Sequence, residues 1–135
     1  MADTSTTFAD LGLPLELVRA LRQEGIEHPF PIQAKAIPQA LGGQDILGRG
    51  PTGSGKTFTF GLPIIASLMQ GASKPKAPRA LILAPTRELA AQIRARLEPI
   101  AASAGQRVLE VVGGVKISHN IRALARPVDI LVATP

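Results

Sequence analysis

Apolar and polar residues follow a helical period in the first third of the chain. Over 14–24, leucine and valine recur every three or four positions between charged side chains, and Gly25 follows. This spacing predicts an amphipathic helix with proline in its first turn and glycine just past its end. A second helix is predicted over 31–41, where two consecutive glycines stop it.

The rest of the chain alternates between short apolar runs and helical segments. The apolar runs predict strands over 45–48, 80–84, 107–112 and 129–133. The run at 80–84 is continuous, which predicts a fully buried strand. Helices are predicted between the strands, over 57–70, 87–102 and 117–125. Strands separated by helices predict an α/β fold with a mainly parallel sheet and flanking helices.

Composition narrows the class of protein. With 135 residues, 45% hydrophobic and 19% charged, the chain is expected to form one globular domain at most. No apolar stretch approaches the roughly 18 residues of a membrane span, and the first residues lack a signal-peptide pattern, so we expect a cytoplasmic protein with no membrane partner. The absence of cysteine excludes disulfides and thiolate metal sites, and His28 and His119 are isolated in the sequence.

Charge is distributed unevenly along the chain. The net charge is +5, but residues 1–44 carry three basic and five acidic side chains, whereas residues 45–135 carry twelve basic and five acidic ones. A basic region of this kind is typical of a polyanionic partner such as RNA or DNA, although solvated helix faces would also account for part of it.

The most specific motif is a phosphate-binding pattern of two glycines five apart followed by lysine and threonine. It comprises Gly50, Pro51, Thr52, Gly53, Ser54, Gly55, Lys56 and Thr57. Glycines let the backbone N–H groups face a phosphate chain, Lys56 can reach the β/γ oxygens, and the Thr57 hydroxyl can hold Mg²⁺. The predicted strand before the motif and the predicted helix after it favour an ATP or GTP site over a glycine-rich surface turn.

The other special segments also follow predicted strands. They are 85–87, 113–114 and 134–135, after the second, third and fourth strands respectively. Because the carboxyl ends of parallel strands meet at one edge of a sheet, we expect these segments to share that edge with the phosphate-binding loop.

At this point the chain resembles the start of the first RecA-like domain of DEAD-box RNA helicases. Residues 25–33 are similar to the family's Q motif, and residues 85–90, Pro-Thr-Arg-Glu-Leu-Ala, match its motif Ia unchanged. The pair 113–114 matches the GG element, and 134–135 matches the start of motif Ib. Ile26 departs from the pattern, because the family usually has an aromatic residue there.

The resemblance implies roles for individual residues. Gln33 would hydrogen-bond the adenine edge and Phe8 would stack on the ring, which selects ATP over GTP. The backbone of single-stranded RNA would be bound by Pro85, Thr86, Arg87, Gly113, Gly114, Thr134 and Pro135. Without the resemblance, Phe8 would be core, Gln33 an exposed polar residue, Thr86 a helix cap and the Gly113–Gly114 pair a turn.

The resemblance also implies that the chain is the beginning of a longer enzyme. We expect N-terminal helices with the Q motif over 1–44 and a truncated RecA-like ATP-binding domain over 45–135. No Asp-Glu-Ala-Asp run occurs in these residues, so we expect the chain alone to bind nucleotide weakly and to turn over little ATP. The incomplete sheet is also expected to make the isolated chain poorly soluble or only partly ordered.

Two rival functions remain open from the sequence. A small-molecule kinase also uses a phosphate-binding loop on a parallel sheet, but it does not require Pro-Thr-Arg-Glu-Leu-Ala after the second strand. A nucleotide- or RNA-binding fragment without chemistry of its own is the second rival. RNA-stimulated phosphate release distinguishes an RNA helicase from both.

Overall fold

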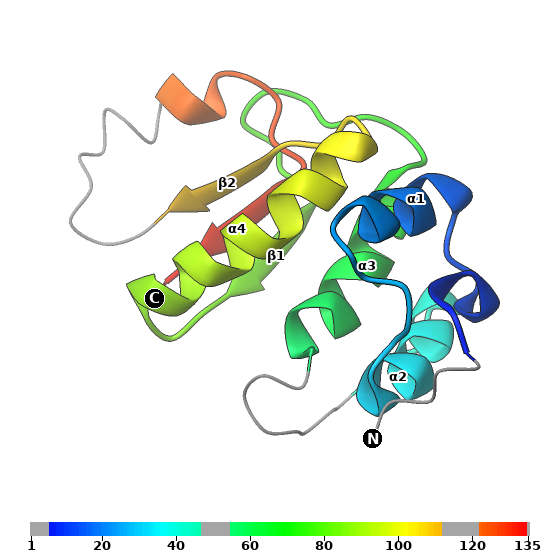
Figure 1. Ribbon diagram of the computed structural model, residues 1–135. Coiled ribbons are helices and arrows are strands. Elements are labelled where there is room, and N and C mark those ends of the chain that lie inside the picture. Colours follow the sequence, from blue (N-terminus) through cyan, green and yellow to red (C-terminus); the bar gives the residue numbers. More distant parts are fainter. Residues whose placement is uncertain (1–5, 47–54, 112–121, 135) are drawn as a thin grey trace. The chain divides into compact units, whose positions relative to one another are not determined.

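The computed structural model describes residues 6–46, 55–111 and 122–134. The chain divides into two compact units, residues 1–67 and residues 68–135, and each is described by itself. Figure 1 shows the helices and strands with their labels.

The first unit is helical. It contains the 3₁₀ helix η1 (Phe8–Leu11), α1 (Leu15–Gln23), α2 (Pro31–Leu41) and nearly all of α3 (Lys56–Leu68). Helix η1 contacts both α1 and α2. The buried residues of α1, Leu17, Val18, Ala20 and Leu21, recur at the spacing of one helix face. The two helices predicted over 14–24 and 31–41 are therefore confirmed, and α2 begins and ends where the sequence predicts.

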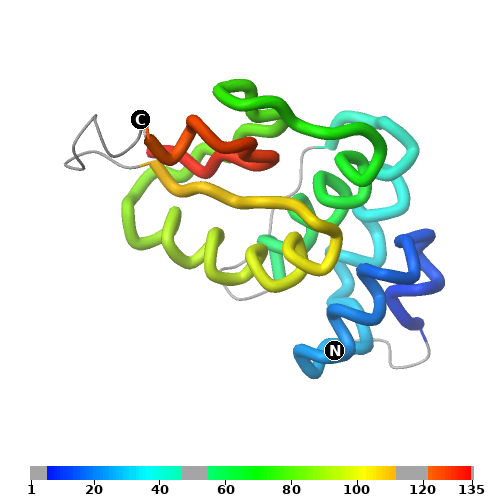
Figure 2. Tube along the Cα trace, turned by 90° about the horizontal axis from the view of Figure 1, so that it is seen from above, coloured from blue at the N-terminus to red at the C-terminus, as the bar shows by residue number. Residues whose placement is uncertain are grey.

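The second unit is a three-stranded parallel sheet with a long helix on it. The strands are β1 (Ala80–Leu83), β2 (Val108–Val111) and β3 (Ile130–Ala133), in the order β1-β3-β2. Helix α4 (Arg87–Ser103) packs on β2 and β3 (Figure 2). Residues 122–124 form a further helical turn. The parallel α/β arrangement predicted from the sequence is confirmed.

The burial of β1 differs from the prediction. Leu81 and Leu83 are 59% and 66% exposed, whereas Ile82 between them is 7% exposed. Strand β1 lies at one end of the sheet order, and in the described part of the chain its Ile82 face is covered whereas its Leu81–Leu83 face is not, so the expectation of a fully buried strand is wrong. A continuous apolar run predicts a strand but does not say how many of its faces are covered.

Two predicted elements fall partly outside the described residues. Of the strand expected over 45–48, Asp45 and Ile46 are described and do not lie in a strand. Of the helix expected over 117–125, only 122–125 is described, and residues 122–124 of that part are helical.

Candidate functional site

In the first unit, Gln33 links the start of α2 to the residue before α3. Its side chain is buried, with the residue 2% exposed. The amide Oε1 accepts from the Phe30 N–H (2.8 Å), and Nε2 donates to the Gly55 carbonyl (2.9 Å). The prediction of an exposed polar residue, made without the resemblance, is therefore wrong. The amide connects the Q motif with the end of the phosphate-binding loop.

Gly55 has a conformation that suits glycine. Its φ is +84°, and its carbonyl also accepts from the N–H (3.2 Å) and the hydroxyl (3.1 Å) of Thr59. Helix α3 begins directly after it, so Lys56 and Thr57 lie in the first helical turn, where free N–H groups and the helix dipole favour anions. Lys56 is exposed and Thr57 half-buried. Residues 50–54 of the motif lie outside the described residues.

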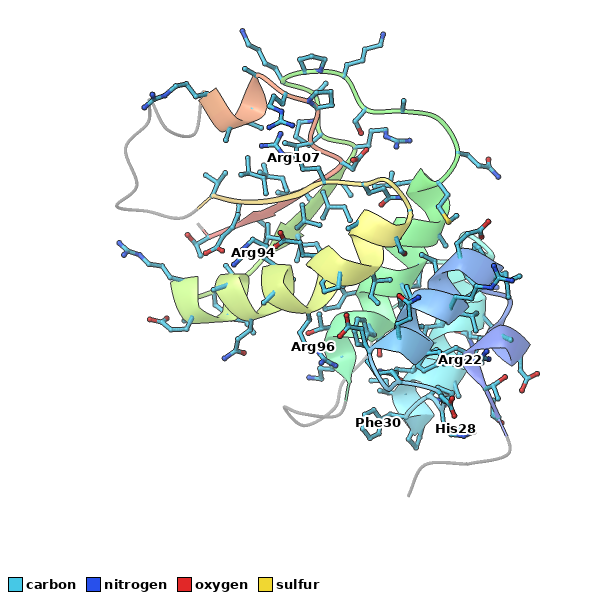
Figure 3. The ribbon with its side chains drawn as sticks, turned by 45° about the horizontal axis from the view of Figure 1, so that its top comes forward. Arg22, His28, Phe30, Arg94, Arg96 and Arg107 are labelled. Carbon is cyan, nitrogen blue, oxygen red and sulfur yellow. The ribbon has the colours of Figure 1, made fainter. Side chains whose placement is uncertain are left out.

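Phe8 is 1% exposed and lines a small pocket of about 110 Å³ within the first unit. Ile26 and His28 line the same pocket. The His28 Nδ1 lies 2.9 Å from the Thr6 carbonyl, and Figure 3 shows His28 near Phe30 in the same unit. Because Phe8 is this deeply buried, stacking on a base would require the ring or its neighbours to move. The adenine contact of Phe8 stays a prediction.

The described RNA-binding candidates of the second unit lie at one edge of its sheet. Pro85, Thr86 and Arg87 follow β1, and Thr134 follows β3. The strand ends are level, because Ala133 pairs with Leu83 on one side and with Val111 on the other. The Thr134 N–H donates to the Val111 carbonyl (3.2 Å). The expected common edge is thus confirmed for these residues, whereas Gly113, Gly114 and Pro135 lie outside the described part of the chain.

Helix α4 begins at this edge with an unusual charge. The Thr86 hydroxyl caps the helix by accepting from the Leu89 N–H (3.1 Å), as the sequence allows. Arg87, the first helical residue, is exposed. A cation at a helix N-terminus opposes the helix dipole, so Arg87 does not stabilise α4 electrostatically. Its exposed guanidinium and the N-terminal N–H groups are suited to binding a phosphate.

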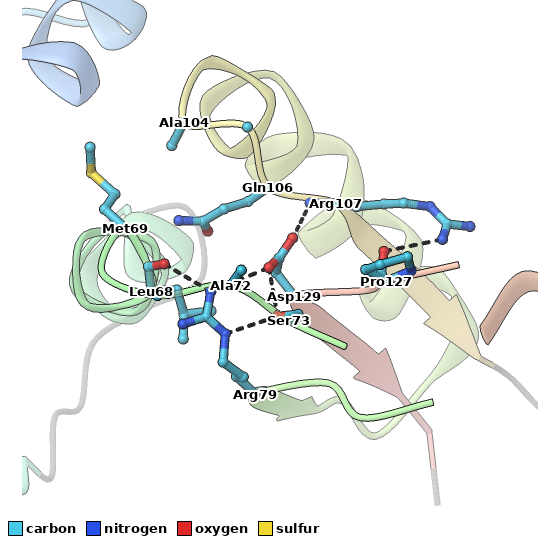
Figure 4. Close-up of a pocket in the computed structure, with 12 residues that line it drawn as sticks. Leu68, Met69, Ala72, Ser73, Arg79, Ala104, Gln106, Arg107, Pro127 and Asp129 are labelled. Carbon is cyan, nitrogen blue, oxygen red and sulfur yellow. Dashed lines mark hydrogen bonds and ion pairs between the residues drawn. The ribbon is translucent and has the colours of Figure 1, made fainter. Parts of the chain in front are cut away.

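A polar cluster that the sequence analysis did not identify lies at the opposite edge of the sheet. We name it the amino-edge cluster, and it consists of Ser73, Arg79, Arg107 and Asp129 (Figure 4). Three of these residues directly precede the three strands. They line a pocket of about 240 Å³ together with the residues that follow α3 and α4. A charged residue directly before each apolar strand is the sequence signal that could have revealed the cluster.

Asp129 is the centre of the amino-edge cluster. Its Oδ1 accepts from the Ser73 hydroxyl (2.6 Å) and lies 3.4 Å from Nη2 of Arg79, and its Oδ2 accepts from the Arg107 N–H (2.8 Å). Burial alone would raise the pKa of Asp129, but these hydrogen bonds and the Arg79 charge lower it below its ordinary value of 3.8. Arg79 also donates to the carbonyls of Leu68 and Gln70, at the end of α3.

The described residues contain neither a candidate metal site nor a candidate membrane span. In the ranges 6–46, 55–111 and 122–134, no group of three histidine, cysteine or carboxylate residues could hold a metal ion. Within those same ranges, no helix is long and apolar enough to cross a bilayer.

Comparison with known proteins defines the class to which this fold and site belong. A family model described as DEAD/DEAH box helicase matches residues 30–135. The solved structure of the RNA helicase Prp28 from Chaetomium thermophilum bound to ADP is 40% identical with a TM-score of 0.88, over 96% of this chain and 32% of that chain. Yeast Prp28, described as a DEAD-box splicing factor, is 33% identical with a TM-score of 0.87, over the same shares.

Curated relatives agree with the family model. The DEAD-box ATP-dependent RNA helicase CshA of Geobacillus kaustophilus is 44% identical over 96% of this chain and 27% of its own length. The ATP-dependent RNA helicase DeaD of Escherichia coli is 44% identical over 100% of this chain and 21% of its own length. This chain belongs to the DEAD/DEAH box helicase family, and it spans about a quarter of the length of these relatives. None of these matches favours the small-molecule kinase.

Proposed function

We propose that this chain supplies the ATP-binding residues and part of the RNA-backbone site of an ATP-dependent RNA helicase. The observation that carries the proposal is the hydrogen bond from Gln33 to the Gly55 carbonyl. It joins the glutamine assigned to adenine with the loop assigned to phosphate, two segments that are 22 residues apart in sequence. A nucleotide held by both segments would span this contact.

In the proposed ATP site, the Gln33 amide keeps capacity for the base. A side-chain amide offers two lone pairs and two N–H groups, and the two bonds to Phe30 and Gly55 use one of each. One acceptor and one donor remain for the edge of adenine, which presents the complementary pair. Guanine carries the acceptor O6 where adenine carries its donor amine, so we propose a preference for ATP, with Phe8 contributing to the base pocket.

The phosphates would be bound by the loop 50–57. Lys56 would neutralise negative charge on the β- and γ-phosphate oxygens. The Thr57 hydroxyl would be a ligand of Mg²⁺, which prefers oxygen ligands. Mg²⁺ bound with ATP would supply charge neutralisation at the transferred phosphoryl group. Both residues belong to the first turn of α3, whose helix dipole adds to the attraction for the phosphates.

The proposed RNA site lies at the carboxyl edge of the sheet. Arg87, the N-terminal N–H groups of α4 and Thr134 would contact phosphates, together with Pro85, Thr86, Gly113, Gly114 and Pro135. Such groups bind the backbone without reading bases, so we propose binding without strong sequence preference. A location in the cytoplasm and the division at residue 44 stay predictions.

Strand separation tests the proposal. The full-length protein is mixed with a short RNA duplex carrying a single-stranded overhang, and strand release is followed in the presence of ATP, GTP or no nucleotide. The proposal predicts release with ATP and little release with GTP. A non-catalytic binding protein would retain the duplex under all three conditions, and that result would refute the helicase assignment.

Replacing Gly55 by alanine tests the Gln33–Gly55 contact. A Cβ on Gly55 would overlap Nε2 of Gln33 and lie 2.7 Å from Cδ2 of Phe30, and φ is +84°. We expect ATP affinity, measured with a fluorescent ATP analogue, to fall about tenfold as the amide is displaced.

Gly43→Ala is the matched control for Gly55→Ala. Gly43 has nearly the same φ, +85°, but a Cβ there would meet no atom within 4 Å. The Gly43→Ala variant therefore has the same backbone strain of about 1 kcal/mol, from an alanine at positive φ, without a clash. Equal losses of ATP affinity in the two variants would show that the Gln33 contact plays no part in nucleotide binding.

A further inference from the structure

Glu110 occupies an unexpected place in the sheet of the second unit. It is the third residue of β2, where it pairs with Val132 of β3, which in turn pairs with Ile82 of β1. Val132 and Ile82 are 0% and 7% exposed. A carboxylate therefore stands in a row of the sheet that is otherwise aliphatic and buried.

Arg94 of α4 is the partner of this carboxylate. Figure 3 labels Arg94 on α4. Its Nε donates to Glu110 Oε1 at 2.8 Å, and its Nη1 contacts Glu98 one helical turn further along α4. The side chains of Arg94 and Glu110 are 37% and 21% exposed. The hydrogen bond to Glu110 is the main cause that raises the pKa of Arg94, and burial opposes it.

The energetics of such a pair favour a role in orientation. An aliphatic residue at position 110 would match its row without a desolvation cost, and half-buried ion pairs add little net stability compared with apolar packing. A guanidinium bonded through Nε to a carboxylate has a narrow range of geometries, however, so the pair fixes where α4 lies along β2.

The pair links the two elements that carry, or directly contact, the described parts of the proposed RNA site. Arg94 is seven residues after Arg87, or about 10 Å along α4. Glu110 directly precedes Val111, whose carbonyl accepts from the Thr134 N–H. A continuous path of contacts thus runs from Arg87 through α4, Arg94 and Glu110 to Thr134.

We propose that Arg94 and Glu110 are positioning residues for RNA-backbone binding. Their ion pair holds α4 at one register against β2 and so sets the separation between Thr86–Arg87 and Thr134. Successive phosphates of an RNA strand are covalently joined, which limits their separation, so a shift of α4 by a fraction of a turn would mismatch the two contacts. This inference rests on the proposed RNA-binding function of the same edge.

The test compares two variants with the same change of charge. Glu110→Gln breaks the link from helix to sheet, whereas Glu98→Gln removes only the partner of Arg94 within α4. Binding of labelled single-stranded RNA to the full-length protein is measured by fluorescence anisotropy at several salt concentrations. We expect Glu110→Gln to weaken RNA binding about fivefold and Glu98→Gln to leave it within about twofold.

The sign of the effect separates positioning from simple electrostatics. Removing a carboxylate near RNA reduces repulsion and by itself strengthens binding. Unchanged or tighter binding by Glu110→Gln would therefore overturn the inference. A second result would also overturn it: Arg94→Gln weakens RNA binding more than Glu110→Gln does, and the slope of log affinity against log salt concentration falls by about 0.7. Arg94 would then contact a phosphate directly.

Charge exchange controls for misfolding. The double variant with Arg94→Glu and Glu110→Arg restores the link with reversed sign, and we expect it to recover at least half of the affinity that Glu110→Gln loses. No recovery in a double variant that melts like the wild type would overturn the inference. Absence of RNA binding in the wild type would instead refute the proposed function, which keeps the two failures distinguishable.

Discussion

Replacing Lys56 by alanine is expected to lower RNA-stimulated ATP hydrolysis by the full-length protein about 100-fold. Lys56 lies in the first turn of α3, directly after the Gly55 carbonyl that Gln33 holds. Loss of its charge leaves the developing charge on the transferred phosphoryl group without a major stabilising contact. Phosphate release at saturating ATP and RNA measures the effect.

The Lys56→Ala variant should still fold and bind RNA. Lys56 is exposed and alanine is a good helix former, so we expect an unchanged melting temperature. RNA affinity without nucleotide should stay within about twofold, because the proposed RNA contacts lie in the second unit. Lys35→Ala, an exposed lysine of α2, is the matched control and should keep full activity. Equal hydrolysis by Lys56→Ala and Lys35→Ala would show that the loop does not bind the reacting phosphates.

Replacing Asp129 by asparagine is expected to destabilise the second unit by about 2 to 3 kcal/mol. Asparagine keeps the shape of the side chain but removes the charge that Arg79 faces, and it turns one acceptor into a donor. The Ser73 hydroxyl or the Arg107 N–H then loses its acceptor in a site where the Asp129 side chain is only 12% exposed. Urea unfolding measures the difference, with the exposed Asp45→Asn as the charge-matched control.

The effect of Asp129→Asn should depend on pH in a defined direction. The pKa of Asp129 is lowered in the folded state below 3.8, so the charged carboxylate stabilises the fold at any pH above that value. This stability is lost as pH falls through the lowered folded pKa. The difference in free energy of unfolding between wild type and Asp129→Asn should therefore be constant down to about pH 5 and shrink below about pH 4. A difference that grows on acidification would mean that Asp129 is not stabilised as an anion.

The elements that could be predicted are those whose ends carry local signals. Helix α2 has proline at its first position and glycine after its last, and its predicted bounds agree with the structure. The three described strands are each found within the predicted range. Strands β1 and β3 are four consecutive apolar residues, and β2 has apolar residues at three of its four positions, with Glu110 as the exception. Burial could not be predicted as well, since Leu81 and Leu83 are as apolar as Ile82, and the sequence does not say which face of β1 is covered.

The site could be predicted as a set of residues but not as a set of contacts. The phosphate-binding pattern and Pro-Thr-Arg-Glu-Leu-Ala are local, so the sequence alone locates them. The partners of a side chain are not local: Gln33 bonds a carbonyl 22 residues away, and Asp129 bonds a hydroxyl 56 residues away. Glu110 is a further example. The sequence shows a charged residue inside a strand, but only the structure shows that Arg94 of α4 is its partner.

An ATP-dependent RNA helicase, which we propose this chain to be part of, hydrolyses ATP in response to RNA. The most direct test is the rate of phosphate release from ATP by the full-length protein, measured with and without single-stranded RNA. We predict that saturating RNA raises the rate about tenfold or more, with GTP hydrolysed much more slowly. A rate that is the same with and without RNA, at concentrations where RNA is bound, would contradict this account.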